Sequence, residues 1–139
     1  MAQFITRETE NKYEAIKELQ NAHLDASFVI GAEGANVINV GIQLKYDKSR
    51  VDSVRRACHA YLSDDANGDS IVATAPSGTV VIGTDGVLLD IGAAKKHFFL
   101  ISESDGDIDI NITEAGVKTL YLVLVLGGRL IPSAAITFA

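Results

Sequence analysis

The chain has little of what a disulfide-stabilised, membrane-spanning or nucleic-acid-binding protein needs. Cys58 is its one cysteine, so no internal disulfide can form. Its most apolar run covers only residues 119–126, whereas a membrane-spanning helix takes about 20 apolar residues. Twelve basic against 18 acidic residues give a net charge of -6, which is unfavourable for contacts with nucleic-acid phosphates. We therefore expect no membrane partner and no nucleic-acid partner.

Signals for export and for catalysis are also missing. The first residues carry neither a basic region nor a long apolar segment, so we expect no signal peptide and synthesis in the cytoplasm. The chain has no phosphate-binding glycine loop, no Gly-x-Ser-x-Gly and no paired His-Glu motif. Its three histidines lie far apart in the sequence, and Cys58 falls on an apolar side where a buried thiol is usual. We expect no catalytic residue, no cofactor and no enzyme activity.

Residues 119–126 are taken as the centre of the fold. The run carries no charge and is followed at once by Gly127-Gly128, which favours a strand covered on both faces. Two glycines between apolar runs also predict a two-residue hairpin, because both accept positive φ at no steric cost. Pro132 has no amide donor, so the returning segment is predicted to be an edge strand or to be broken there by a bulge.

Period-two patterns predict further strands through the rest of the chain. Apolar residues alternate with polar ones in two segments, Ile38, Val40, Ile42, Leu44 and Tyr46 in the first and Ile108, Ile110 and Ile112 in the second. Weaker strands are predicted at 70–74 and 79–82, a hairpin turn at Asp85-Gly86 into 87–91, and a buried strand at 97–101. Seven or more short strands without intervening helices predict an antiparallel β-sandwich, immunoglobulin-like or jelly-roll-like, over residues 31–139.

Residues 1–30 are predicted to form an N-terminal helical arm. The segment 6–25 has apolar residues at near-helical spacing, including Tyr13, Ile16 and Leu19. A helix of this length is marginal on its own in water, so its apolar stripe must pack on something. Two alternatives are open, the body of its own domain or a neighbouring subunit.

Clustered acidic residues raise the question of a calcium site. Oxygen ligands gather in two segments, Asp64, Asp65, Asn67 and Asp69 in the first and Asp105, Asp107 and Asp109 in the second. The first departs from the helix-loop-helix calcium pattern, since Pro76 stands in the place of the bidentate glutamate. A solvated acidic face explains both clusters more simply, and we predict no metal site.

The order of several short phrases in residues 36–139 resembles a family of small tailed-bacteriophage virion proteins. Those phrases are Asn36-Val37-Ile38-Asn39-Val40, Gln43-Leu44-Lys45, Ala60-Tyr61-Leu62-Ser63-Asp64-Asp65, Gly83-Thr84-Asp85-Gly86, Ser104-Asp105-Gly106 and Ser133-Ala134-Ala135-Ile136-Thr137-Phe138-Ala139. The resemblance implies an immunoglobulin-like or related β-sandwich that serves as a capsid decoration or cement protein. It transfers no catalytic residue.

From these features we expect a non-enzymatic virion structural protein, made in the host cytoplasm, that binds and stabilises the capsid exterior. Its partners would be the major capsid protein and further copies of itself, and the resemblance makes a trimer possible. Tyr13, Ile16 and Leu19 are the first candidates for interface residues. The alternative is a receptor- or glycan-binding sandwich of a tail, fibre or surface adhesin, with recognition by the loops 64–69 and 102–107.

Overall fold

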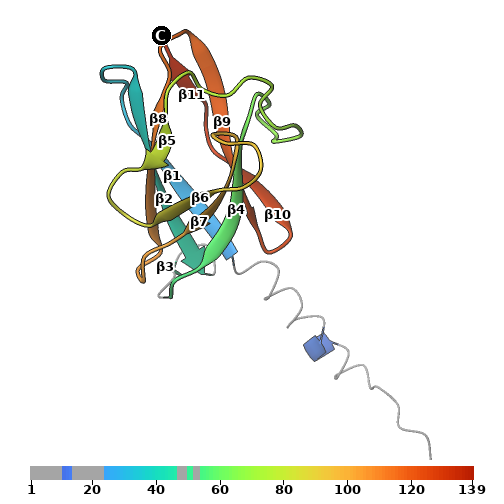
Figure 1. The fold of residues 1–139 in the computed structure, drawn as a ribbon. Coiled ribbons are helices and arrows are strands. Elements are labelled where there is room, and N and C mark those ends of the chain that lie inside the picture. Colours follow the sequence, from blue (N-terminus) through green and yellow to red (C-terminus); the bar gives the residue numbers. More distant parts are fainter. Residues whose placement is uncertain (1–10, 14–23, 47–49, 52–53) are drawn as a thin grey trace, which may run out of the picture.

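Two antiparallel β-sheets pack face to face around one apolar core (Figure 1). This computed structural model describes residues 11–13, 24–46, 50–51 and 54–139. The predicted antiparallel β-sandwich is confirmed, and its immunoglobulin-like or jelly-roll-like subtype stays a prediction. In the described ranges there is no helix with the length and apolar character needed to cross a membrane.

Sheet A has four strands in one path and a short fifth strand that pairs with one of them. Its order is β1 (Leu24–Ile30), β2 (Val37–Tyr46), β8 (Asp107–Thr113) and β5 (Val80–Ile82), with β3 (Arg50–Val51) pairing with the end of β2. The predicted alternation is confirmed here: Ile38, Val40, Ile42 and Leu44 are buried, as are the three isoleucines of β8. Period-two patterning therefore fixes which side of sheet A faces the core.

Sheet B is organised around the run that the sequence places at the centre. Its order is β10 (Arg129–Pro132), β9 (Lys118–Leu126), β4 (Ala57–Ser63), β7 (His97–Ile101) and β6 (Val87–Asp90), and β11 (Ile136–Phe138) pairs with the start of β9. Four leucines of β9 point into the core and are almost wholly buried: Leu120, Leu122, Leu124 and Leu126.

The two-glycine hairpin between β9 and β10 is confirmed. Leu126 pairs directly with Arg129, and Gly127 and Gly128 have φ values of 54° and 75°. Positive φ at both central residues suits the right-handed twist of the flanking strands. Pro132 pairs with Val123 from β10, which has no further strand beyond it in the described part of sheet B. The predicted edge position of Pro132 is confirmed as well.

The N-terminal prediction is wrong at its carboxyl end. Leu24–Ile30 is a strand that pairs with β2 along its whole length, from Leu24 opposite Tyr46 to Ile30 opposite Val40. The helix predicted for 6–25 cannot reach Asp25, and the sandwich begins at Leu24 rather than at residue 31. The physical reason is that Leu24, Ala26, Phe28 and Ile30 alternate toward the core, where pairing with β2 outweighs a marginal helix. Residues 11–13 are helical.

Two predictions between β4 and β7 are also wrong. Residues 70–74 form no strand, and their backbone makes one sheet-like bond, from Val72 N–H to the Leu62 carbonyl at 2.8 Å. Asp85-Gly86 closes no hairpin, because β5 belongs to sheet A and β6 to sheet B. The turn at Gly86, with φ of 97°, carries the chain from one sheet to the other.

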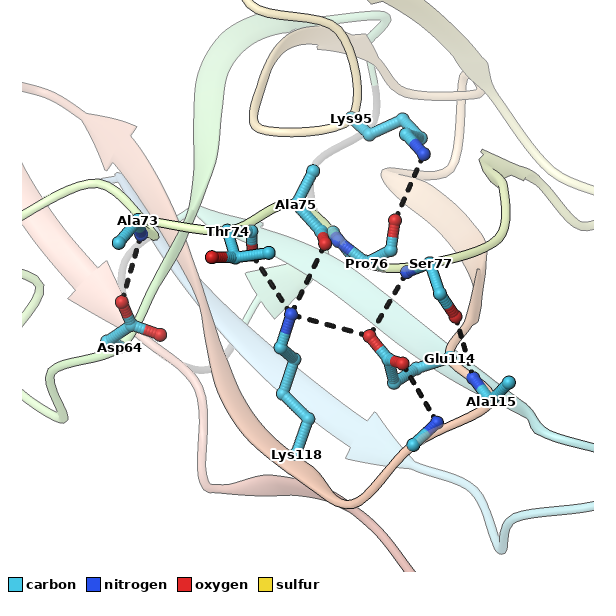
Figure 2. Close-up of polar contacts among 11 residues, drawn as sticks. Asp64, Ala73, Thr74, Ala75, Pro76, Ser77, Lys95, Glu114, Ala115 and Lys118 are labelled. Carbon is cyan, nitrogen blue, oxygen red and sulfur yellow. Dashed lines mark hydrogen bonds and ion pairs between the residues drawn. The ribbon is translucent and has the colours of Figure 1, made fainter.

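The long connection between β4 and β5, residues 64–79, is fastened to the end of the sandwich (Figure 2). The Glu114 carboxylate accepts hydrogen bonds from Gly116 N–H at 2.9 Å and Ser77 N–H at 3.1 Å. Lys118 Nζ lies 3.4 Å from the same carboxylate and donates to the Thr74 carbonyl at 3.0 Å. The Gly116 hydrogen bond, aided by Ser77 and Lys118 and opposed by burial, lowers the pKa of Glu114 to about 2.

Candidate interaction surface

A row of side chains crosses the outer face of sheet B, one from each of its five successive strands. Strand register places Leu130 opposite Val125, Val125 opposite His59, His59 opposite Phe99 and Phe99 opposite Leu89. Leu130 is 47% exposed and Leu89 is 52% exposed. We call these five residues the crossing row. Four of the five are apolar, so water contacts a largely apolar band at the surface of the domain, with His59 at its centre.

The outward positions around the crossing row carry no formal charge. They are Ala57, Tyr61 and Ser63 of β4, Val87 of β6, His97 and Ile101 of β7, Thr119, Tyr121 and Val123 of β9, and Pro132 of β10. Sheet A differs, because Asp25, Lys45, Asp107 and Asp109 share its outer face. The two faces of the sandwich therefore have opposite character, one acidic and polar and the other uncharged and largely apolar.

The chain already covers one end of the sheet B outer face with its own loop. Val123 is outward-facing yet fully buried, and a side chain at Gly68 would meet Val123 Cγ2 at 3.0 Å. Tyr61 donates its hydroxyl proton to the Gly68 carbonyl, which holds the loop against the sheet. Burial, followed by the charges of Asp69 and Asp65, raises the pKa of this tyrosine. The remaining part, namely the crossing row with Ala57, Val87 and Ile101, is called the open face.

His59 of the crossing row contacts His97, which is distant from it in the sequence. His59 Nδ1 lies 3.2 Å from His97 Nε2, with the two rings within 22° of parallel, and His59 also packs on the Phe99 ring at 4.2 Å. A neutral pair shares one hydrogen bond, in which one ring donates and the other accepts. Two rings alone do not make a metal centre, and no group of three His, Cys, Asp or Glu residues gathers as ligands in the described ranges.

The Cys58 side chain lies on the core-facing side of sheet B rather than on its outer face. The side chain is buried in the core, and that burial raises the pKa of the thiol to about 11. Thiolate is the nucleophilic form of cysteine, so a thiol held protonated in an apolar core is unreactive at neutral pH.

Carboxylates in the loop 64–69 hold the backbone of their own connection. Asp65 accepts hydrogen bonds from Asn67 N–H at 3.0 Å and Asp69 N–H at 3.3 Å, and Asp64 accepts one from Ala73 N–H at 3.0 Å. These bonds give the acidic loop residues a structural role in shaping the turn.

Asp109 of sheet A likewise holds the backbone of a connecting loop by accepting hydrogen bonds. It accepts hydrogen bonds from the N–H groups of Thr84 at 2.8 Å and Asp85 at 2.7 Å, and from Asn39 Nδ2 at 2.7 Å. Burial tends to raise the pKa of Asp109, but these hydrogen bonds outweigh it and leave the pKa below its ordinary value. Neighbouring Asp107 has a raised pKa because of burial first and then the charges of Asp105, Asp85, Glu103 and Asp109.

The two loops of the receptor-binding alternative do not lie together. Strands β4 and β7 are antiparallel, with Ala57 opposite Ile101 and Tyr61 opposite His97. The loop after β4 and the loop after β7 therefore leave sheet B at opposite ends of the domain (Figure 1). The two loops therefore do not join into one continuous recognition site, and recognition by either loop separately stays a prediction.

The interface residues predicted from the sequence lie on the arm. Tyr13 is 61% exposed, while Ile16 and Leu19 fall outside the described residues, so their role stays a prediction. The sequence does not predict the crossing row, and it predicts that residues 119–126 are covered on both faces. That expectation holds for Val123 but not for Val125, which is half-buried. The sequence shows the apolar members of the crossing row one by one, but only the strand register shows that they are neighbours.

Comparisons with known proteins identify a partial relative. An 84-residue stretch is 32% identical to a leucine–tRNA ligase from Sinorhizobium medicae (strain WSM419); it covers 60% of this chain and 10% of the ligase. The chain thus spans about a tenth of the length of that protein. No family model matches the chain. No solved structure matches it either.

Proposed function

We propose that this chain is a non-enzymatic structural protein of a tailed-bacteriophage virion that binds the outer surface of the capsid shell and reinforces it. The observation that carries the proposal is the open face of sheet B. A surface that is apolar and uncharged over five strands suits burial against another protein. The resemblance of residues 36–139 to phage decoration and cement proteins supplies the partner, the major capsid protein.

The proposed contact has a defined orientation. The open face would lie against the shell, and the outer face of sheet A, with Asp107 and Asp109, would face water. Covering a leucine that is half-exposed, such as Leu89 or Leu130, stabilises a complex by roughly 1 kcal/mol. One copy would therefore bind modestly, and many copies bound across a shell would give tight reinforcement through multivalency.

The N-terminal arm is proposed as a second contact. Tyr13 is exposed in the described part of the arm, and with Ile16 and Leu19 it would add apolar area to the interface. Deleting residues 1–23 tests this role, because the sandwich begins at Leu24. A folded chain that binds shells more weakly supports the contact, whereas loss of folding would mean that the stripe packs on its own sandwich.

Co-sedimentation with purified shells tests the proposal. The full chain is expected to pellet with shells, and Leu89→Glu and Leu130→Glu are each expected to weaken binding by about tenfold or more, because a buried unpaired carboxylate is costly. Val81→Glu is the matched control, since Val81 is 45% exposed on the outer face of sheet A. Equal binding by all four proteins would contradict the proposed face, and no binding by the native chain would contradict the function.

Leucine activation tests the opposite class of function. The chain spans a tenth of the ligase that it matches, so we expect the pure protein to give no leucine-dependent ATP–pyrophosphate exchange. Leucine-dependent exchange by the pure protein would contradict the proposed structural role and indicate a catalytic one.

A further inference from the structure

We propose that two copies of this chain pair edge to edge through strand β1, so that their A sheets become one continuous sheet across a twofold axis. The inference uses a different surface from the open face of sheet B and does not depend on the capsid role. Strand β1 is an outermost strand of sheet A and pairs only with β2 among the described residues. Its other side is where a second copy would be added.

The hydrogen-bond pattern shows which backbone groups point outward. Gly31 N–H donates to the Asn39 carbonyl at 2.8 Å, so Gly31 and Asn39 form a hydrogen-bonded pair of the antiparallel ladder. Such pairs alternate with non-hydrogen-bonded ones. Residues 25, 27 and 29 therefore direct their N–H and C=O groups toward β2, and residues 24, 26, 28 and 30 direct theirs away from the sheet.

Two side chains block the beginning of this edge. Arg129 Nη2 donates to the Leu24 carbonyl at 3.0 Å, and Ala26 N–H donates to the Asp25 carboxylate at 2.9 Å. No described residue outside the β1–β2 ladder bonds the N–H and C=O groups of Phe28 and Ile30. Four backbone groups, two donors and two acceptors, are thus presented at regular spacing on an open edge.

The other edges of the two sheets are protected in ordinary ways. Strand β10 contains Pro132, which cannot donate, and strands β5, β6 and β11 have 3, 4 and 3 residues. Short strands and prolines are the usual means of preventing edge-to-edge association. Strand β1 has 7 residues without lysine, proline or a bulge in its pairing with β2. Among the described strands, β1 is therefore a long edge strand that lacks these protections.

One antiparallel register satisfies all four groups with a second copy of the same strand. Phe28 of each copy would lie opposite Ile30 of the other, and each pair would exchange two hydrogen bonds. This register sets Val29 opposite Val29 at the twofold axis, which makes the contact self-complementary. It also leaves the bonds that Arg129 and Asp25 make at the start of the strand undisturbed.

The exposure of Val29 agrees with this register. Val29 is 73% exposed because its cross-strand neighbour on β2 is Gly41, which has no side chain to cover it. In the dimer the two valines would cover each other on the outer face of the joined sheet. Residues 26–30 contain no charged side chain, so two chains of net charge -6 would meet at an uncharged segment.

Size-exclusion chromatography with light scattering on the full chain tests the pairing. The native protein is expected to be a dimer, and Val29→Lys is expected to be monomeric at concentrations where the native protein is dimeric, because a lysine pair at the axis repels. Val81→Lys is the matched control on the same face at the opposite edge and should remain dimeric. A monomeric native protein, or a Val29→Lys variant that stays dimeric, would overturn the inference.

A disulfide trap tests the register and does not rely on destabilising the dimer. Cα atoms in a non-hydrogen-bonded pair are about 4.5 Å apart, within the range that a disulfide spans. Val29→Cys should therefore form a covalent dimer on mild oxidation, while buried Cys58 does not compete. Ser27→Cys is the control, because the proposed register sets residue 27 opposite residue 31. Faster cross-linking through position 27 than through position 29 would refute the register.

Discussion

Glu114 is the residue whose replacement tests the described packing of the long connection most sharply. Its side chain is buried, with 6% exposure, and its carboxylate receives the amides of Gly116 and Ser77 and the ammonium of Lys118. Glu114→Ala would leave both amides without their acceptor. Hydrogen bonds to a charged group contribute about 1.5–3 kcal/mol each, and because Gly116 and Ser77 are exposed, water partly replaces the two that are lost, so we expect the free energy of unfolding to fall by about 2–4 kcal/mol. For a chain of this size the melting temperature would drop by roughly 6–16 °C.

Glu114→Gln separates the charge from the shape of this side chain. The folded-state pKa of about 2 lies below the ordinary value of 4.5, so the ionised carboxylate stabilises the native state at neutral pH. That stabilisation is present above pH 4.5 and is lost as the pH falls toward 2. We expect native protein and variant to differ at neutral pH and to converge near pH 2.

Urea unfolding of both proteins at the two pH values measures this difference. Glu103→Gln is the control, because its carboxylate makes none of the described hydrogen bonds or ion pairs, and it should follow the native curve closely. A difference between native protein and Glu114→Gln that is the same at both pH values would refute the argument, because no ionisation would then be linked to folding.

Three further predictions concern the core and the surface. Leu122→Ala in the centre of β9 should lower the free energy of unfolding by about 2–5 kcal/mol in denaturant titrations, and a loss below 1 kcal/mol would mean that the centre is loosely packed. Gly83→Ala should destabilise the protein by about 2–4 kcal/mol, because a Cβ there would overlap Asp109 Oδ2; an unchanged melting temperature would contradict this contact. Cys58 should react with a thiol reagent at neutral pH only as fast as the chain unfolds, and rapid labelling of the native protein would contradict its burial.

The sequence predicts the strands well where one pattern dominates. The alternating isoleucines of β8, the leucines of β9 and the Gly127-Gly128 turn each signal their local structure, because strand period and positive φ are local properties. The sequence fails at Asp85-Gly86, which has the composition of a hairpin turn but connects two sheets. Turn residues determine that the chain bends, and tertiary packing determines which sheet it enters.

The candidate surface was harder to predict than the fold. Leu130, Val125, His59, Phe99 and Leu89 come from five strands, and no local pattern relates them. Their adjacency depends on non-local pairing of strands. The open edge of β1 is hidden for another reason, since the sequence predicts that residues 24–30 belong to a helical arm. The boundary between arm and sandwich therefore decides whether this strand edge can be seen in the sequence.

Particle imaging at residue resolution tests the central claim most directly. The proposed function predicts copies spread over the capsid exterior, with Leu89 and Leu130 of sheet B against the shell and Asp107 and Asp109 of sheet A toward water. Copies confined to a tail tip, or seated on the shell by the acidic outer face of sheet A, would contradict it.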